Sequence, residues 1–226
     1  MTSILAKIFA RFKGKAKDTR AGSSSVEVEE EADGRSITKE AINKLPLKRY
    51  EGPIVWVDSD KAAARAILEL EAEKVLGFDT ETKPSFRKKQ SFLPSLLQFA
   101  TSDKVFLFRL PSLKNFAGFA EILSDKKVLK TGVALDQDIK KLNEIFEFEP
   151  NGFVDLGKLA QTHQFRQTGL RNLCAILLGF RLSKGSQVTD WSKEKLSSAQ
   201  INYAATDAWA SRELYIFMKR SSEWEV

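Results

Sequence analysis

At 226 residues, the chain has room for one domain with a terminal tail, or for two small domains. Its hydrophobic content of 42%, with 16 phenylalanines, is enough for a substantial core, and its net charge of +6 favours an anionic partner. The single cysteine, Cys174, excludes an intrachain disulfide and fits a reducing compartment, so we expect a cytoplasmic protein. No apolar run approaches the roughly 20 residues that a membrane-spanning helix needs.

The N-terminal stretch leaves two interpretations open. Residues 4–17 combine apolar side chains at helical spacing with basic ones. They form either a tail with transient order, or an amphipathic helix that makes weak contact with a membrane surface or targets an organelle. Residues 14–34 are rich in glycine and serine and then in acids, which is typical of a flexible linker. We therefore expect a flexible tail over residues 1–46 and a folded domain over residues 47–226.

Strand-like and helix-like patterns alternate through the first part of this domain. Strands are expected at 54–57, 75–81, 95–101, 105–109 and 128–131, and helices at 36–45, 59–70, 116–123 and 133–146. Beyond Gly152 the pattern is mostly helical, and Ser197 with Gln200 resembles a capping box at the start of the last helix. Strands alternating with helices, followed by a helical C-terminal half, predict an α/β fold with a mixed sheet.

The second expected strand ends in two acids, Asp79 and Glu81, which are separated by one residue. Because side chains alternate along a strand, both carboxylates point to the same face. Two buried acids side by side repel each other unless a metal ion or a basic group lies between them, or unless one stays protonated. The alternative is an acidic strand end that faces solvent.

Further acids follow at positions that could converge on the same point. Asp136 and Asp138 lie at the expected start of a helix, where acids are also favoured as simple N-terminal residues. In the last helix, Tyr203 and Asp207 are four residues apart and share a face, among alanines that favour burial.

Four carboxylates without a set of histidines or cysteines favour hard divalent cations such as Mg²⁺ or Mn²⁺. Two such ions about 4 Å apart hydrolyse phosphodiesters, one by activating water and the other by stabilising the leaving oxygen. A tyrosine on the same helix face as an acid can orient the attacking water.

These residues fall within three short motifs in chain order: Phe78-Asp79-Thr80-Glu81, Thr131-Gly132-Val133-Ala134-Leu135-Asp136-Gln137-Asp138, and Tyr203-Ala204-Ala205-Thr206-Asp207-Ala208. With this order and spacing, residues 54–218 resemble the 3′–5′ exonuclease domain of the DEDD superfamily, in its tyrosine subtype. The chain is most similar to the Werner-type and ribonuclease D branch. The histidine subtype would need a histidine at position 202, which is an asparagine here.

The resemblance implies a role for each motif residue. The implied metal ligands are Asp79, Glu81, Asp138 and Asp207, and the implied water-orienting residue is Tyr203. Asp138 is implied rather than Asp136 because it stands six residues after Gly132, as in the family pattern. The implied fold is ribonuclease H-like, with a mixed sheet of about five strands flanked by helices. The implied activity is hydrolysis of single-stranded 3′ ends of DNA or RNA, with two divalent cations, Mg²⁺ or Mn²⁺, as cofactors.

A basic loop follows the second strand and interleaves cations with aromatic side chains. Cations bind phosphates while phenylalanine stacks on a base, although such a loop can also be merely solvated, with its phenylalanines packed on the domain. The candidate nucleic-acid contacts are Lys83, Phe86, Arg87, Lys88 and Lys89 in the loop, and Arg171 and Lys184 further along the chain.

Two alternatives stay open beside a general exonuclease. One is an RNA-trimming enzyme of the ribonuclease D type, because the motifs serve both polymers. The other is a catalytically silent nucleic-acid-binding module whose acids bind metal only structurally. The presence of all four acids and of Tyr203 argues against the silent module.

Overall fold

The computed structural model of this protein describes residues 35–87, 90–221 and 224. The amphipathic stretch 4–17, the linker 14–34, and Lys88 and Lys89 of the basic loop lie outside the described residues. The interpretations of these segments therefore stay predictions.

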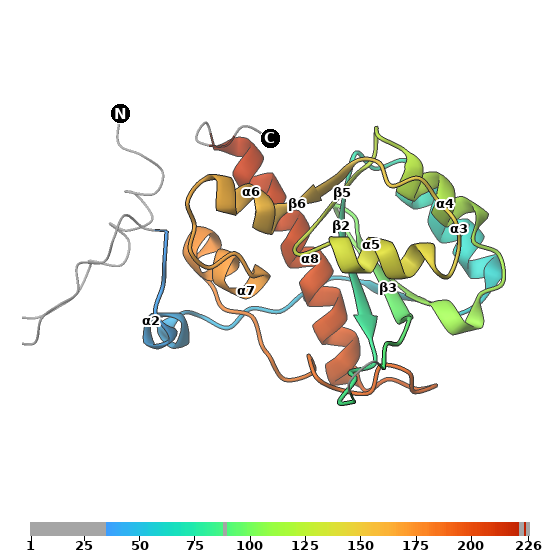
Figure 1. Cartoon of the computed structure of the whole chain (residues 1–226), viewed down its shortest axis with the longest axis horizontal. Coiled ribbons are helices and arrows are strands. Elements are labelled where there is room, and N and C mark those ends of the chain that lie inside the picture. The colour runs from blue at the N-terminus through green and yellow to red at the C-terminus, as the bar shows by residue number, and fades with distance from the viewer. Residues whose placement is uncertain (1–34, 88–89, 222–223, 225–226) are drawn as a thin grey trace, which may run out of the picture.

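The centre of the fold is a six-stranded mixed sheet with the strand order β1-β4-β3-β2-β5-β6 (Figure 1). The strands are β1 (Ile54–Val57), β2 (Val75–Thr82), β3 (Pro94–Ala100), β4 (Val105–Arg109), β5 (Leu129–Gly132) and β6 (Phe153–Asp155). β2, β3 and β4 are antiparallel neighbours, whereas β1 joins β4, β5 joins β2 and β6 joins β5 in parallel. The predicted mixed sheet is confirmed, with β6 as a strand that was not predicted. Its three residues are too few for a strand period to be recognised.

Helices cover both faces of this sheet (Figure 1). One face packs on α3 (Asp60–Glu71), α4 (Ala117–Ser124) and α5 (Asp136–Asn143) through a phenylalanine-rich core. The other face is covered by the long α8 (Ser198–Arg220), beside α6 (Leu156–Thr162), α7 (Leu170–Leu173) and the π-helical turn η2 (Cys174–Leu178). A short 3₁₀ turn, η1 (Leu110–Ser112), follows β4. Within the described part of the chain, no helix is both long and apolar enough to cross a membrane.

The last helix begins and packs in ways that the sequence pattern explains. The predicted capping box of Ser197 and Gln200 is present at its start. Further along, a Cβ atom on Gly77 of β2 would lie only 1.9 Å from the carbonyl oxygen of Ala208, so no larger residue fits there. Glycine at this point therefore lets the middle of α8 approach β2 two residues before Asp79, the first acid of the strand.

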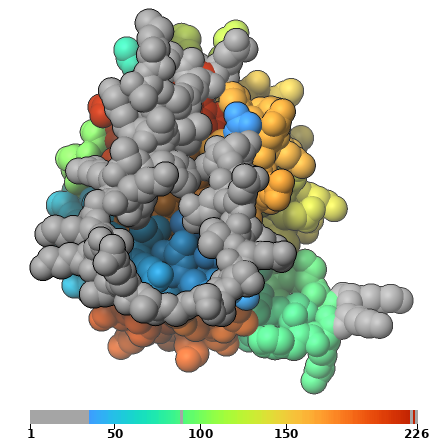
Figure 2. All heavy atoms as spheres, turned by 90° about the vertical axis from the view of Figure 1, so that its left-hand side faces the viewer, coloured from blue at the N-terminus to red at the C-terminus, as the bar shows by residue number. Residues whose placement is uncertain are grey.

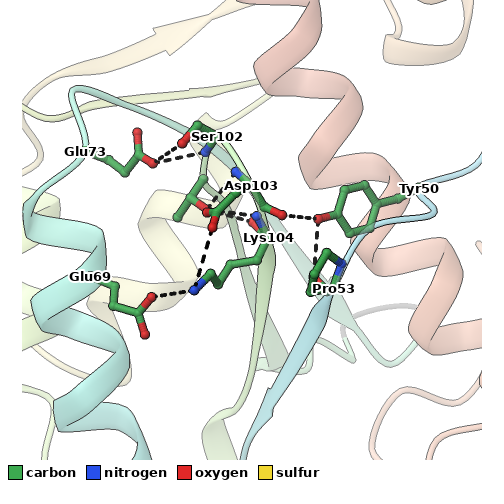
Figure 3. A network of polar contacts seen from close by, with 8 residues as sticks. Tyr50, Pro53, Glu69, Glu73, Ser102, Asp103 and Lys104 are labelled. Carbon is green, nitrogen blue, oxygen red and sulfur yellow. Dashed lines mark hydrogen bonds and ion pairs between the residues drawn. The ribbon is translucent and has the colours of Figure 1, made fainter.

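The predicted β3–β4 hairpin is confirmed, and its turn is tied to two neighbouring elements (Figure 3). Lys104 forms an ion pair of 2.7 Å with Glu69 of α3, and the Ser102 hydroxyl donates to Glu73 at 2.8 Å. The Tyr50 hydroxyl donates to a main-chain carbonyl of the turn at 3.2 Å. This network fastens the end of the β2–β3 ladder that is remote from Glu81, where Ala100 pairs with Gly77.

A short helix, α2 (Lys39–Lys44), precedes the sheet and packs on the domain. Thr38 caps its N-terminus, and Ile42 and Leu45 are buried against Ala175 of η2. The helix was predicted, but it was assigned to the tail. The structure packs it against η2, and the boundary expected at residue 47 stays a prediction.

Candidate active site

The two acids of β2 lie on the face that α8 covers. Leu76 and Phe78 enter the phenylalanine-rich core, so the residues that alternate with them point the other way. Asp79 is half-buried and Glu81 is buried. The common orientation of the two carboxylates follows from the strand alternation.

α8 adds a third acid to this pair. Carboxylate oxygens of Asp79, Glu81 and Asp207 lie within 4.8 Å of one another. Asp207 precedes Ala208, the residue whose carbonyl touches Gly77. The glycine contact therefore sets the distance at which Asp207 meets the acids of β2.

α5 adds a fourth acid from the neighbouring side. The Thr80 hydroxyl donates a short hydrogen bond to Oδ1 of Asp138. The charge of Asp138 also raises the pKa of Asp79 and of Glu81. The other candidate, Asp136, is exposed and forms an ion pair with Lys158 at 2.6 Å. Of the two acids that the sequence left open, Asp138 is the one beside the cluster.

Two residues to which the sequence analysis assigned no role support this arrangement. Thr80 holds Asp138 from the opposite face of β2. Asp155 accepts hydrogen bonds from the main-chain nitrogen of Leu135 at 3.1 Å and of Gly157 at 2.9 Å, and so ties the starts of α5 and α6 together. An aspartate directly before a helical pattern is a recognisable capping signal, but its second partner is visible only in the fold.

Burial and mutual repulsion dominate the electrostatics of the cluster. Burial, with the charges of Asp207 and Asp138, raises the pKa of Asp79 well above its ordinary value. Burial, with Asp79, raises the pKa of Glu81 to about 10. Burial raises the pKa of Asp207 to about 7, and burial also raises the pKa of Asp138. The four groups must therefore bind protons or cations to remain where they are.

Tyr203 lies one turn before Asp207 on α8, and its hydroxyl is hydrogen-bonded to the Asp207 carboxylate. Burial and the charge of Asp207 raise the pKa of Tyr203, so the phenol stays protonated. Its ring packs on the buried Trp191, with ring centroids 6.1 Å apart. This packing fixes a neutral hydrogen-bond donor at the edge of the cluster.

The donor set suits a hard divalent cation. All four groups offer carboxylate oxygens, which are the ligands that Mg²⁺, Mn²⁺ and Ca²⁺ prefer. Within the described residues, no ion pair joins a lysine or an arginine to any of the four acids. A divalent cation bound by these oxygens would balance their charge.

The candidate nucleic-acid contacts fall into two groups. Lys83, Phe86 and Arg87 line a hollow of about 360 Å³ beside Val188. Phe86 is 84% exposed, whereas Lys83 forms an ion pair of 3.2 Å with Asp190. We name these three residues the loop site.

The second group lies in a different cavity. Arg171 and Lys184 line a groove of about 690 Å³, and Tyr203 and Asp207 lie in the wall of the same groove. The structure therefore places these two cations on the surface that leads to the acidic cluster.

The fold and the site together define an α/β protein with a buried carboxylate cluster that is suited to divalent cations. A family model described as 3′–5′ exonuclease matches residues 54–223. This chain therefore belongs to the 3′–5′ exonuclease family, in agreement with the resemblance carried by its motifs.

Known relatives agree with this assignment. Exonuclease 3′-5′ domain-containing protein 2 of Homo sapiens is 34% identical over 196 residues, which cover 81% of this chain and 31% of that protein. The bifunctional 3′-5′ exonuclease/ATP-dependent helicase WRN of Mus musculus is 29% identical over 183 residues, which cover 76% of this chain and 13% of that protein. The chain thus spans less than a third of the length of either relative.

A solved structure shares the fold. The crystal structure of Trypanosoma brucei RNase D in complex with RNA U12 matches with a TM-score of 0.68 at 20% identity, covering 83% of this chain and 67% of that chain. The ribonuclease H-like architecture expected from the motifs is therefore confirmed.

Proposed function

We propose that this protein is a metal-dependent 3′–5′ exonuclease that hydrolyses phosphodiester bonds from single-stranded 3′ ends of DNA or RNA. The observation that carries this proposal is the convergence of three carboxylates from β2 and α8, with oxygens within 4.8 Å of one another, beside Asp138 of α5 and with Tyr203 one turn from Asp207. Such a cluster opposes folding when no cation is bound, so a purely structural role would not explain it.

Four residues would hold the metal ions: Asp79, Glu81, Asp138 and Asp207. Two divalent cations, Mg²⁺ or Mn²⁺, would supply the Lewis acidity that activates water and stabilises charge on the phosphate. Thr80 would keep Asp138 in position through its hydrogen bond. The Tyr203 hydroxyl, which its surroundings keep protonated, would donate a hydrogen bond that orients the attacking water.

The polymer is the second part of the proposal. A role in trimming RNA is supported by the RNA bound to the Trypanosoma brucei protein of the same fold. An enzyme distinguishes RNA from DNA through contacts to the 2′-hydroxyl. The motif residues shared by both kinds of enzyme do not determine these contacts. We place the protein in a reducing compartment such as the cytoplasm, because its single cysteine, Cys174, is buried and free.

The experiment uses 5′-labelled single-stranded DNA and RNA of matched sequence with Mg²⁺ or Mn²⁺. We expect wild type and Asp136→Ala to shorten one or both polymers stepwise from the 3′ end. Asp79→Ala, Asp207→Ala and EDTA should each abolish shortening. Folded wild type that binds both strands but shortens neither would refute the enzyme and favour the silent binding module.

A further inference from the structure

The groove beside the acidic cluster is walled on its far side by α2. Its lining runs from Tyr203 and Asp207, along the segment from Gly169 to Lys184, to α2 itself. Figure 2 looks onto the side of the molecule on which α2 lies, and the segment that contains it (blue) is at the surface there. The cavity is therefore made by parts of the chain that are distant in sequence.

The chemistry of the lining suits a nucleic-acid strand. It contains three cations and a single acid, Asp207 of the metal cluster. The cations are Lys39, Arg171 and Lys184, and the amides include Asn43, Asn172 and Gln187. Cations bind phosphates and amides bind base edges, so the groove can hold the nucleotides next to the cluster.

Arg171 has an unpaired donor beside the groove. Its Nε atom is shielded from solvent and has no hydrogen-bond partner among the described residues. A guanidinium donor in that position normally has an acceptor, because an unpaired buried donor is costly. If the guanidinium turned toward the groove, a phosphate oxygen there would supply the acceptor and would suit the geometry of arginine.

Two of the three α2 residues in the lining, Lys39 and Asn43, are polar and exposed, whereas the third, Ile42, is buried. Lys39 and Asn43 are four residues apart, and therefore share one face of the helix. Lys39 is the first residue of α2, where a cation is unfavourable to the helix dipole. Its position is therefore not explained by the stability of the helix.

We propose that α2 is part of the substrate-binding site, and that Lys39 and Asn43 contact the strand opposite Arg171 and Lys184. This inference rests on the proposed function. α2 precedes residues 54–223, which match the exonuclease family, so this wall is an addition to what the family model describes. It would enclose a single strand between two walls and increase the affinity for substrate rather than the rate of the chemical step.

The test compares the double variant Lys39→Gln/Asn43→Ala with a matched control, Lys44→Gln. Lys44 belongs to the same helix and is exposed, but it does not line the groove. Binding of a 5′-labelled single strand is measured by fluorescence anisotropy in EDTA, which prevents turnover, at several salt concentrations. KM and kcat are measured separately with Mn²⁺, and thermal unfolding confirms that each variant is folded.

We expect the double variant to raise Kd and KM roughly 3- to 10-fold, to make the salt dependence of Kd shallower, and to leave kcat within about twofold of wild type. Lys44→Gln should behave as wild type. If the folded double variant binds as tightly as wild type while both hydrolyse the strand, the α2 wall is refuted and the proposed function stands. If wild type binds the strand without hydrolysing it, the proposed function fails. The Kd values of the variants then still test whether α2 contacts the strand. Wild type that binds no strand would overturn both.

Discussion

Asp207 shows how the buried carboxylates oppose folding when no cation is bound. Its pKa is raised from 3.8 to about 7 in the fold, so the unfolded chain releases this proton more readily. A carboxyl whose pKa is raised by folding stabilises the folded state at pH values below its pKa in the unfolded chain. This contribution is lost as the pH rises through the folded-state pKa of about 7. We therefore expect Asp207→Asn to increase the free energy of unfolding of the metal-free protein by a few kcal/mol at pH 8, on the order set by the shift. Thermal unfolding in EDTA between pH 4 and pH 8 measures the gain, which should grow with pH.

The control for this prediction is Asp136→Asn, which makes the same chemical change at an exposed acid outside the cluster. It should leave the stability of the metal-free protein nearly unchanged at every pH. Addition of Mn²⁺ should raise the Tm of wild type and of this control, but much less that of Asp207→Asn. A gain that does not depend on pH would contradict the role assigned to the charge of Asp207.

Tyr203 is predicted to act on the rate and not on metal binding. Removing its hydroxyl in Tyr203→Phe should lower kcat roughly 10- to 100-fold, since the donor that orients water is lost. KM and the Mn²⁺-induced rise in Tm should stay close to those of wild type. Tyr215→Phe removes the hydroxyl of the other tyrosine on α8, which is buried, and should change none of these values. An equal loss of kcat in both variants would assign the effect to the packing of α8.

The contact of α8 with β2 is the structural element on which the site geometry depends. In Gly77→Ala the new methyl group would meet the carbonyl of Ala208, which belongs to the helix backbone and can move only with it. We expect a loss of about 3 kcal/mol or more in the free energy of unfolding, and loss of activity because Asp207 is displaced. Gly185→Ala is the control, because its Cβ would have one neighbour, the Ser183 hydroxyl at 3.5 Å. Urea denaturation and the 3′-end assay measure the two effects, and a stable, active Gly77→Ala would disprove the contact.

The elements differ in how far the sequence could predict them. β2, the β3–β4 hairpin and α8 have clear periodicity, turn residues or a capping box, and all were predicted. β6 was not, because three residues carry no period. Asp138 could be preferred to Asp136 only through the family motif, since both acids suit a helix start. The hydrogen bond from Thr80 that distinguishes them in the structure depends on the packing of α5 beside β2.

At the scale of the whole molecule, the groove could not be predicted. A hydrogen bond of 3.0 Å from the main-chain nitrogen of Ile37 to Gln167 joins segments 130 positions apart, and no local pattern records such a pairing. The linker-like composition before residue 35 also favoured assigning α2 to the tail. The net charge of +6 indicated an anionic partner, but the placement of the cations in two separate sites is a result of the fold.

These two sites should bind a strand through different forces. Phe86 of the loop site is uncharged and 84% exposed, so it would bind a base by stacking, whereas Arg171 of the groove would bind a phosphate. We expect Phe86→Ala to weaken binding by about 1–3 kcal/mol with an unchanged salt dependence. Arg171→Gln should weaken binding most at low salt and make the dependence of log Kd on log salt shallower by about 0.7.

The matched control is Leu68→Ala, which removes another exposed apolar side chain, on α3, from the far side of the sheet. It should leave Kd unchanged. Anisotropy titrations at four salt concentrations separate the two signatures. A shallower salt slope in Phe86→Ala, with none in Arg171→Gln, would reverse the assignment of the two sites. Equal losses of affinity in all three variants, with no dependence on salt, would instead indicate a general loss of fold. The loss of a phosphate contact alone would change the salt dependence, because binding through phosphates releases counterions.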